Sequence, residues 1–244
     1  MTNTMTIRHH YNPNFIHHQK SKILPFIREV VFGVEDGMVS TLGALTGIAT
    51  ATGDYFIIVL SGVVVIAVES ISMGVGSYLS NKSERDVDLR KIHEEKQELK
   101  KFPKEEKEEL RAIYIEDGWP ADLAHTMAET ASQNKDLFLK EMTVHELAVM
   151  PVEDHHPVRN GIVMFFSYVI GGMTPLVPYL LFPITYALPL SIIITLVGLF
   201  FVGVGTTKFT KRKWWKAGLE MFGLASIAAL IGYVVGQGAE YLMR

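Results

Sequence analysis

The sequence has no cysteine among its 244 residues. A disulfide framework and a thiolate metal site are therefore both excluded. Any metal ligands that this chain supplies must be carboxylate oxygens, imidazole nitrogens or thioether sulfurs.

Charge is also missing from long parts of the chain, and no Asp, Glu, Lys or Arg lies between Asn160 and Thr207. Five stretches are apolar over a length that can cross a bilayer core of roughly 30 Å. We therefore predict an all-α polytopic membrane protein with five transmembrane helices. The stretches are Ile27–Thr52, Tyr55–Ser80, Gly161–Phe182, Ile184–Thr207 and Trp214–Gln237.

Most of the charge gathers in one segment between the second and third of these stretches. Residues 81–156 contain 12 Lys and Arg against 19 Asp and Glu, a net charge of −7, although the whole chain carries only −3. This contrast divides the chain into four regions. We expect a polar N-terminal arm at 1–24, transmembrane helices one and two at 25–82, an acidic helical module inserted at 83–156, and transmembrane helices three to five at 157–244.

The N-terminal arm lacks the apolar core of a signal peptide. It carries two histidine pairs, His9 with His10 and His17 with His18. Histidine pairs outside an ordered element are more often incidental than metal ligands, so the role of these four residues stays open.

The Lys and Arg residues predict the orientation in the membrane. The links at 51–54 and 182–183 contain none, whereas the N-terminal arm, the start of the insertion and the link at 208–216 are rich in them. By the positive-inside rule, the N-terminus and the inserted module are cytoplasmic and the C-terminus lies on the far side.

The longest helical pattern runs from Tyr55 to Phe102. It is apolar up to Ser80 except for Glu69, and it is then rich in Glu, Lys and Arg with no helix breaker before Pro103. We predict one continuous helix of roughly 70 Å, half in lipid and half in water.

Three shorter helices complete the predicted module. Pro103 begins the first, which Gly118 ends; Pro120 begins the second, and Asn134 caps the third, which continues until Pro151. A module of this size buries little apolar surface by itself. We expect it to pack against the extended second helix or against a second subunit.

Glycine pairs predict close packing of the first transmembrane helix. Gly33 with Gly37, and Gly43 with Gly47, are each four residues apart, which allows neighbouring helices to approach closely. Transmembrane helices three and four contain no charged residue, and we interpret them as a scaffold.

Ionisable side chains in the first two transmembrane helices are the strongest functional signal. Asp36 follows Glu29 by two turns on nearly the same face, and Glu69 lies one turn before Met73. A carboxylate in hydrocarbon holds either a proton or a cation, and exchanging the two is a proton-coupled transport step. Alternatively, the acidic residues serve only helix packing and Met73 is an ordinary core residue.

Pairs of carboxylates three residues apart recur in the module, followed by a Met and a Glu four residues apart. Each spacing brings its two side chains to one helix face. Converging faces of this kind build oxygen-rich sites for iron, manganese or zinc. Neighbouring lysines can instead pair with the acids on a solvated surface. The candidate ligands are Glu95, Glu98, Glu106, Glu109, Met142 and Glu146.

Three segments together resemble the vacuolar iron transporter family. They are REVVFGVEDGMVSTLGALTGI at 28–48, ESISMGVGSYLSNKSERD at 69–86 and SYVIGGMTPLVPY at 167–179. The resemblance implies five transmembrane helices, a dimer with the ion path between its subunits, and proton-coupled movement of ferrous iron out of the cytosol. It also implies a cytoplasmic, carboxylate-lined metal-binding module between helices two and three.

The resemblance implies roles for individual residues in the membrane path. The path acid falls on Asp36, the acid nearer the cytoplasmic mouth on Glu29, and the path methionine on Met73. This chain departs from some relatives by having Val65 two turns before that methionine, so that Glu69 is its only glutamate in this span.

In the module, the family's metal ligands fall on all six candidates named above. Where a methionine pair occurs in some relatives, Met142 is here followed by Thr143.

We therefore predict a homodimeric divalent metal transporter that is not an enzyme and exchanges cytosolic Fe²⁺ for protons. Mn²⁺ and Zn²⁺ are alternative ions for the module, and a manganese exporter of the same mechanism is an alternative function. A membrane-tethered di-iron oxidase and a passive channel are further alternatives. We expect a multi-pass protein of the plasma membrane in a prokaryote or of a vacuolar-type membrane in a eukaryote, with no nucleic-acid partner.

Overall fold

The computed structural model describes residues 24–147 and 156–243. This part of the chain consists of eight α-helices and contains no strand, which confirms the predicted all-α class. Two predicted features lie outside the described residues. They are the arm at 1–23 with its histidine pairs, and the end of the third module helix at Pro151.

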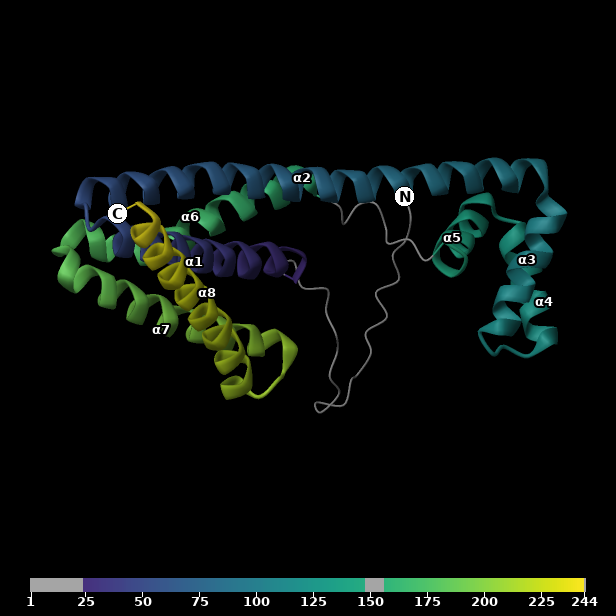
Figure 1. The fold of residues 1–244 in the computed structure, drawn as a ribbon. Helices are drawn as coiled ribbons and strands as arrows, with labels where there is room; N and C mark the ends of the chain where they lie inside the picture. The colour runs from purple at the N-terminus through teal and green to yellow at the C-terminus, as the bar shows by residue number, and fades with distance from the viewer. Residues whose placement is uncertain (1–23, 148–155, 244) are drawn as a thin grey trace, which may run out of the picture.

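The helices form two groups (Figure 1). One is a bundle in which α1 contacts the first half of α2 and three further helices, and the other is a small module in which three helices lie near the second half of α2. The bundle comprises α1 (Leu24–Thr52), α2 (Tyr55–Lys101), α6 (Pro157–Leu181), α7 (Ile184–Thr210) and α8 (Trp214–Met243). The module adds α3 (Pro103–Glu116), α4 (Ala121–Ser132) and α5 (Lys135–His145).

α2 is continuous over 47 residues, as predicted, and links the two groups (Figure 1). The Asp54 side chain caps its first turn by accepting the backbone N–H of Ile57 at 3.0 Å. The helix ends immediately before Pro103, which begins α3. A rigid rod therefore joins the apolar bundle to the charged module.

Within the described residues, four helices are long and apolar enough to cross a membrane, namely α2, α6, α7 and α8. α1 is not among them because Arg28, Glu29, Glu35 and Asp36 occupy its first half. It nevertheless contacts each of these four helices. The helix that contacts all the others in the bundle thus carries three acidic residues.

The glycine pairs of α1 pack as predicted. Gly37 lies against α6, where an added Cβ would meet the carbonyl oxygen of Tyr168. Gly47 lies against α8, where an added Cβ would come within 2.9 Å of the carbonyl oxygen of Gly232. The two pairs therefore pack against two different neighbours, α6 and α8.

A pair of buried asparagines ties α2 to α6 where α2 leaves the bundle. Asn160 Nδ2 donates to Asn81 Oδ1 at 2.7 Å, and Asn81 Nδ2 donates to the carbonyl oxygen of Ser77 at 2.8 Å. Each side-chain amide thus donates a hydrogen bond to a buried oxygen: Asn160 to the other asparagine, and Asn81 to a carbonyl of its own helix. This contact holds the base of the rod against the bundle.

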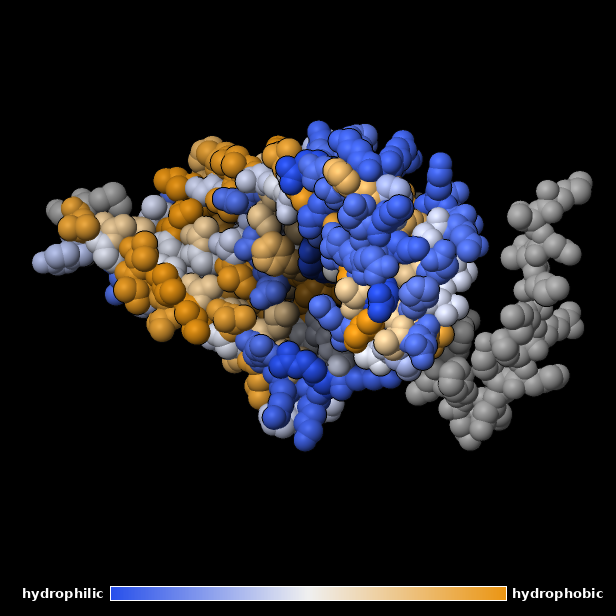
Figure 2. Space-filling view, turned by 90° about the vertical axis from the view of Figure 1, so that its right-hand side faces the viewer, coloured by the Kyte–Doolittle hydropathy of each residue, from blue (hydrophilic) through white to orange (hydrophobic). Residues whose placement is uncertain are grey.

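The module has its own apolar core, which confirms that it packs against the extended second helix. Leu110, Tyr114, Phe138 and Met142 are buried in it, and Leu99 of α2 packs against them. Viewed from the module end, hydrophilic side chains cover most of this group, whereas the bundle behind it is largely hydrophobic (Figure 2). This division is typical of a protein with one part in lipid and one in water.

Candidate functional site

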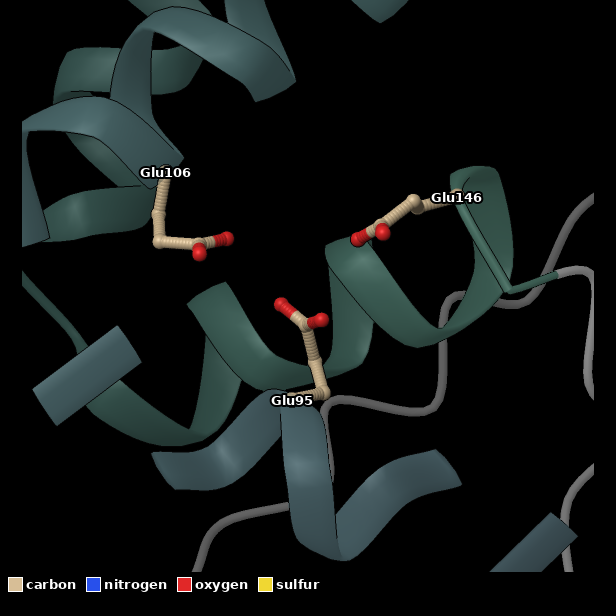
Figure 3. Close-up of side chains that lie close together, drawn as sticks. All are labelled: Glu95, Glu106 and Glu146. Atoms are coloured by element: carbon tan, nitrogen blue, oxygen red, sulfur yellow. The ribbon is translucent and has the colours of Figure 1, made fainter. Parts of the chain in front are cut away.

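Three carboxylates from three different helical segments converge in the module (Figure 3). Glu95 comes from α2, Glu106 from the first turn of α3 and Glu146 from the C-terminal cap of α5. One oxygen of each lies within 4.8 Å of the others. Oxygens at this separation can share a single divalent cation.

Local sequence signals place each of these residues. Pro103 turns the chain sharply after α2, so that Glu106 faces back towards Glu95. Asn134 caps α5 by accepting the N–H groups of Asp136 and Leu137. At the other end, the N–H of Glu146 still donates to the carbonyl oxygen of Met142 at 2.9 Å, which keeps Glu146 in helical register beyond the last full turn.

Two of the three carboxylates are almost completely shielded from water. Glu95 is 2% exposed and Glu106 is 7% exposed, whereas Glu146 is exposed. Among the described residues, Oε1 of Glu95 has no hydrogen-bond partner although it is buried. An unpartnered buried carboxylate oxygen is costly. A cation bound between the three residues would remove that cost.

Burial and mutual repulsion raise the pKa values of these acids. Desolvation, followed by the charges of Glu146 and Glu106, raises the pKa of Glu95 to about 8. Desolvation, followed by the charge of Glu109, raises the pKa of Glu106 to about 7. Desolvation also raises the pKa of Glu146. The cluster therefore retains protons near neutral pH until a cation displaces them.

Metal binding at this cluster is expected to release protons and to weaken on acidification. At pH 6, below the raised pKa values of Glu95 and Glu106, a cation must displace protons from both carboxyls, whereas at pH 8.5 it displaces few. Titration of the full-length protein with Mn²⁺ should show this as tighter binding at pH 8.5 and greater proton uptake by the buffer at pH 6 to 7. Affinity independent of pH over this range would contradict the assignment of Glu95 and Glu106 as ligands.

The other three candidates occupy different surroundings. Glu98 and Glu109 lie close enough to raise the pKa of Glu106 by their charge, but they are not part of the converging group. Met142 is fully buried in the apolar core of the module with Leu110 and Phe138. Its thioether is therefore shielded from water, whereas Glu98 and Glu109 place negative charge near Glu106.

The acids predicted for the membrane path lie in the bundle. The carboxylates of Asp36 on α1 and Glu69 on α2 interact electrostatically. Asp36 and Met73 are partly buried, whereas Glu69 is exposed on the surface of the single chain. At the start of α1, Glu29 is buried and accepts a hydrogen bond from Arg28 at 2.9 Å, while its second oxygen has no partner among the described residues.

Tyr168 of α6 belongs to the surroundings of Asp36, although the lack of charged residues in this span predicts a scaffold helix. Ser40 Oγ donates to the carbonyl oxygen of Asp36 at 2.6 Å, and the fully buried Tyr168 hydroxyl lies 2.6 Å from Ser40 Oγ. The available sequence signal was a phenol in a span without charged residues, three residues before Gly171.

Comparison with known proteins extends over both the bundle and the module. A family model described as the VIT family matches residues 27–237. Vacuolar iron transporter 1 of Arabidopsis thaliana is 27% identical over 216 residues, which cover 88% of this chain and 86% of the relative. A vacuolar iron transporter of Plasmodium berghei (strain Anka) is 29% identical over 238 residues, which cover 93% and 86%. Vacuolar iron transporter 1 of Oryza sativa subsp. japonica is 26% identical over 233 residues, which cover 95% and 91%.

Proposed function

Because the chain belongs to the VIT family, we propose that it is a divalent metal transporter that moves ferrous iron out of the cytosol in exchange for protons. The family match and the names of the relatives support iron as the cargo. Direction and proton coupling are our inference from the charge distribution and from the acids in the bundle.

One observation carries the proposal: α2 bears both Glu95 of the buried carboxylate cluster and Glu69 of the bundle on a single continuous helix. A cation collected at the module thus lies at one end of a rod whose other half carries an acid next to Asp36. We propose that Glu29, Asp36, Glu69 and Met73 form the path, and that the module supplies metal to its cytoplasmic mouth.

We propose that α1 is the fifth transmembrane helix. Its 29 residues are long enough to span a bilayer, and its contacts with the four apolar helices shield its acids from lipid. With five spans, the basic link at 211–213 lies on the same side as the module. The positive-inside rule then makes that side cytoplasmic and places the C-terminus on the far side.

We further propose that the transporter is a homodimer. Glu69 is exposed on the single chain, in the middle of an apolar span. A carboxylate in that position would otherwise face hydrocarbon, which is strongly unfavourable. A second copy packed on this face of α2 would enclose Glu69 in a path between the two subunits.

Reconstitution into liposomes tests the transport proposal. We expect Fe²⁺ to accumulate in vesicles with an acidic lumen, the lumenal pH to rise with it, and both changes to be small when the initial pH gradient is absent. Lumenal metal and pH should be recorded together under reducing conditions. Metal entry without proton movement would indicate a channel, and no entry of any divalent ion would exclude a transporter.

Manganese is a second candidate cargo, because the donor atoms of the module also suit it. The converging ligands are all carboxylate oxygens, while the only predicted sulfur ligand of the module, Met142, lies in the apolar core. Oxygen ligands suit Mn²⁺ as well as Fe²⁺. Competition between the two ions in the liposome assay decides between them. The clustered residues include no histidine, so the Glu-x-x-His ligand pattern of di-iron bundles is not met, and we propose no oxidase activity.

A further inference from the structure

A second group of polar side chains lies where α5 meets the end of α3. His145 on α5 has its Nδ1 3.0 Å from Oδ2 of Asp117, which caps α3. Its other ring nitrogen, Nε2, lies 3.5 Å from Oε2 of Glu141, one turn earlier on α5. The hydroxyl of Tyr114 donates to the same Glu141 oxygen at 2.9 Å.

The hydrogen bonds of this group determine which atoms are free to bind a cation. A carboxylate only accepts hydrogen bonds, so Nδ1 of His145 donates its proton to Asp117. In the neutral ring, Nε2 then carries a lone pair that faces the Glu141 carboxylate. Two acceptor atoms that face each other are stabilised by a positive charge between them, either a proton or a metal ion.

The separation of the two atoms favours a metal ion. A charge-assisted hydrogen bond between a protonated ring and a carboxylate is ordinarily about 2.7–2.9 Å long, shorter than the 3.5 Å found here. By contrast, one nitrogen and one oxygen ligand bound tetrahedrally to Zn²⁺ are separated by about 3.4 Å.

We propose that Nε2 of His145 and the carboxylate of Glu141 form a second divalent-cation site in the module. Asp117 and Tyr114 complete it as outer-shell partners, since histidine ligands ordinarily donate their other N–H to a carboxylate and ligating carboxylates are themselves hydrogen-bonded. The Tyr114 ring also packs edge-on against His145, with centroids 5.3 Å apart, which restricts the orientation of the imidazole.

The donor atoms define the class of ion. Imidazole with carboxylate suits Zn²⁺ and Fe²⁺ and disfavours Mg²⁺ and Ca²⁺. Because the described residues supply two ligands here, we expect water to occupy the remaining coordination positions and the bound ion to exchange readily. The side chains of His145 and Glu141 are 29% and 26% exposed, so an ion reaches them directly from solvent. This site does not depend on the proposed transport function.

Histidine NMR of the full-length protein in detergent, with ¹⁵N-labelled histidine and Zn²⁺ as the probe, tests the site. We expect Zn²⁺ to move one Nε2 resonance from the position of a free ring nitrogen to that of a metal-bound one. That resonance should be missing in His145→Gln and unchanged in His125→Gln, a matched replacement of an exposed histidine on α4. The metal-bound resonance should persist in the double variant Glu95→Gln with Glu106→Gln, in which the three-carboxylate cluster is impaired.

Replacing the outer-shell residue Asp117 provides a second test of the site. Asp117→Asn should weaken Zn²⁺ binding at this resonance by about 10-fold to 100-fold. The proposal is overturned if the His145 resonance of the unsubstituted protein does not respond to saturating Zn²⁺, or if it has the shift of a protonated ring under all conditions. Both results are read from the native chain, so they do not depend on any variant folding. Transport in liposomes is measured separately, and its failure would leave this result unaffected.

Discussion

Replacing Asp36 by asparagine is expected to reduce metal uptake into liposomes to the level of protein-free vesicles, while the protein still folds and inserts. The carboxylate interacts electrostatically with that of Glu69, and the backbone carbonyl of Asp36 accepts a hydrogen bond from Ser40, whose hydroxyl also contacts that of Tyr168. Asparagine keeps the size of the side chain but neither binds a proton near neutral pH nor neutralises a divalent ion. Both metal flux and the accompanying change in lumenal pH should disappear together.

Asp54→Asn is the matched control for this experiment. Asp54 lies in the short link before α2, and its side chain caps the helix through the N–H of Ile57. Asparagine caps a helix about as well as aspartate, so this variant loses the same charge without loss of the cap. It should transport at the native rate. If Asp36→Asn also transported at that rate, Asp36 would have no place in the path.

Replacing Glu95 by glutamine is expected to weaken metal binding at the module by roughly 100-fold, because the cluster loses one of three charged ligands. Without metal, the variant should be at least as stable as the native protein. Burial and neighbouring acids raise the pKa of Glu95 to about 8, so near neutral pH the folded protein must either take up a proton at Glu95 or bury its charge, and a neutral amide avoids both costs. Calorimetric titration with Mn²⁺ and thermal unfolding without metal measure the two effects.

Glu94→Gln is the comparison for Glu95→Gln. Glu94 is the preceding residue of α2 and is exposed, 3.6 Å from Arg90. Its loss should leave the metal affinity unchanged, because a surface ion pair contributes little and Glu94 lies outside the cluster. In liposomes, Glu95→Gln should slow uptake at low Fe²⁺ and leave it near native at saturating Fe²⁺. Equal metal affinity in the two variants would exclude Glu95 as a ligand.

Much of the architecture could be predicted from local signals. The continuous α2 follows from a run without breakers between Asp54 and Pro103, and the two glycine pairs of α1 pack against neighbouring helices as their spacing indicated. The acids of α1 were recognised as unusual in a membrane span, and they are also why that helix does not qualify as a span by composition. These features depend on residues close together in the chain, which a periodic pattern records directly.

The composition of the carboxylate cluster depends instead on how helices cross. Spacing places Glu95 and Glu98 on one face of α2, but only Glu95 meets Glu106 and Glu146, because α3 and α5 approach α2 at that turn. Met142 lies one turn before Glu146, and the packing of the module buries it with Leu110 and Phe138. A helical repeat defines the face of a side chain, whereas its partner depends on packing between distant segments.

The same reason explains Tyr168 and the group around His145. The Tyr168 hydroxyl reaches Ser40 across 128 positions of the chain, and His145 reaches Asp117 across 28. Periodicity carries no information about such pairs, since it is local. The composition and order of the residues therefore specify the helices and the kinds of ligand available, while the packing of α1 with α6 and of α3 with α5 selects which of those ligands meet.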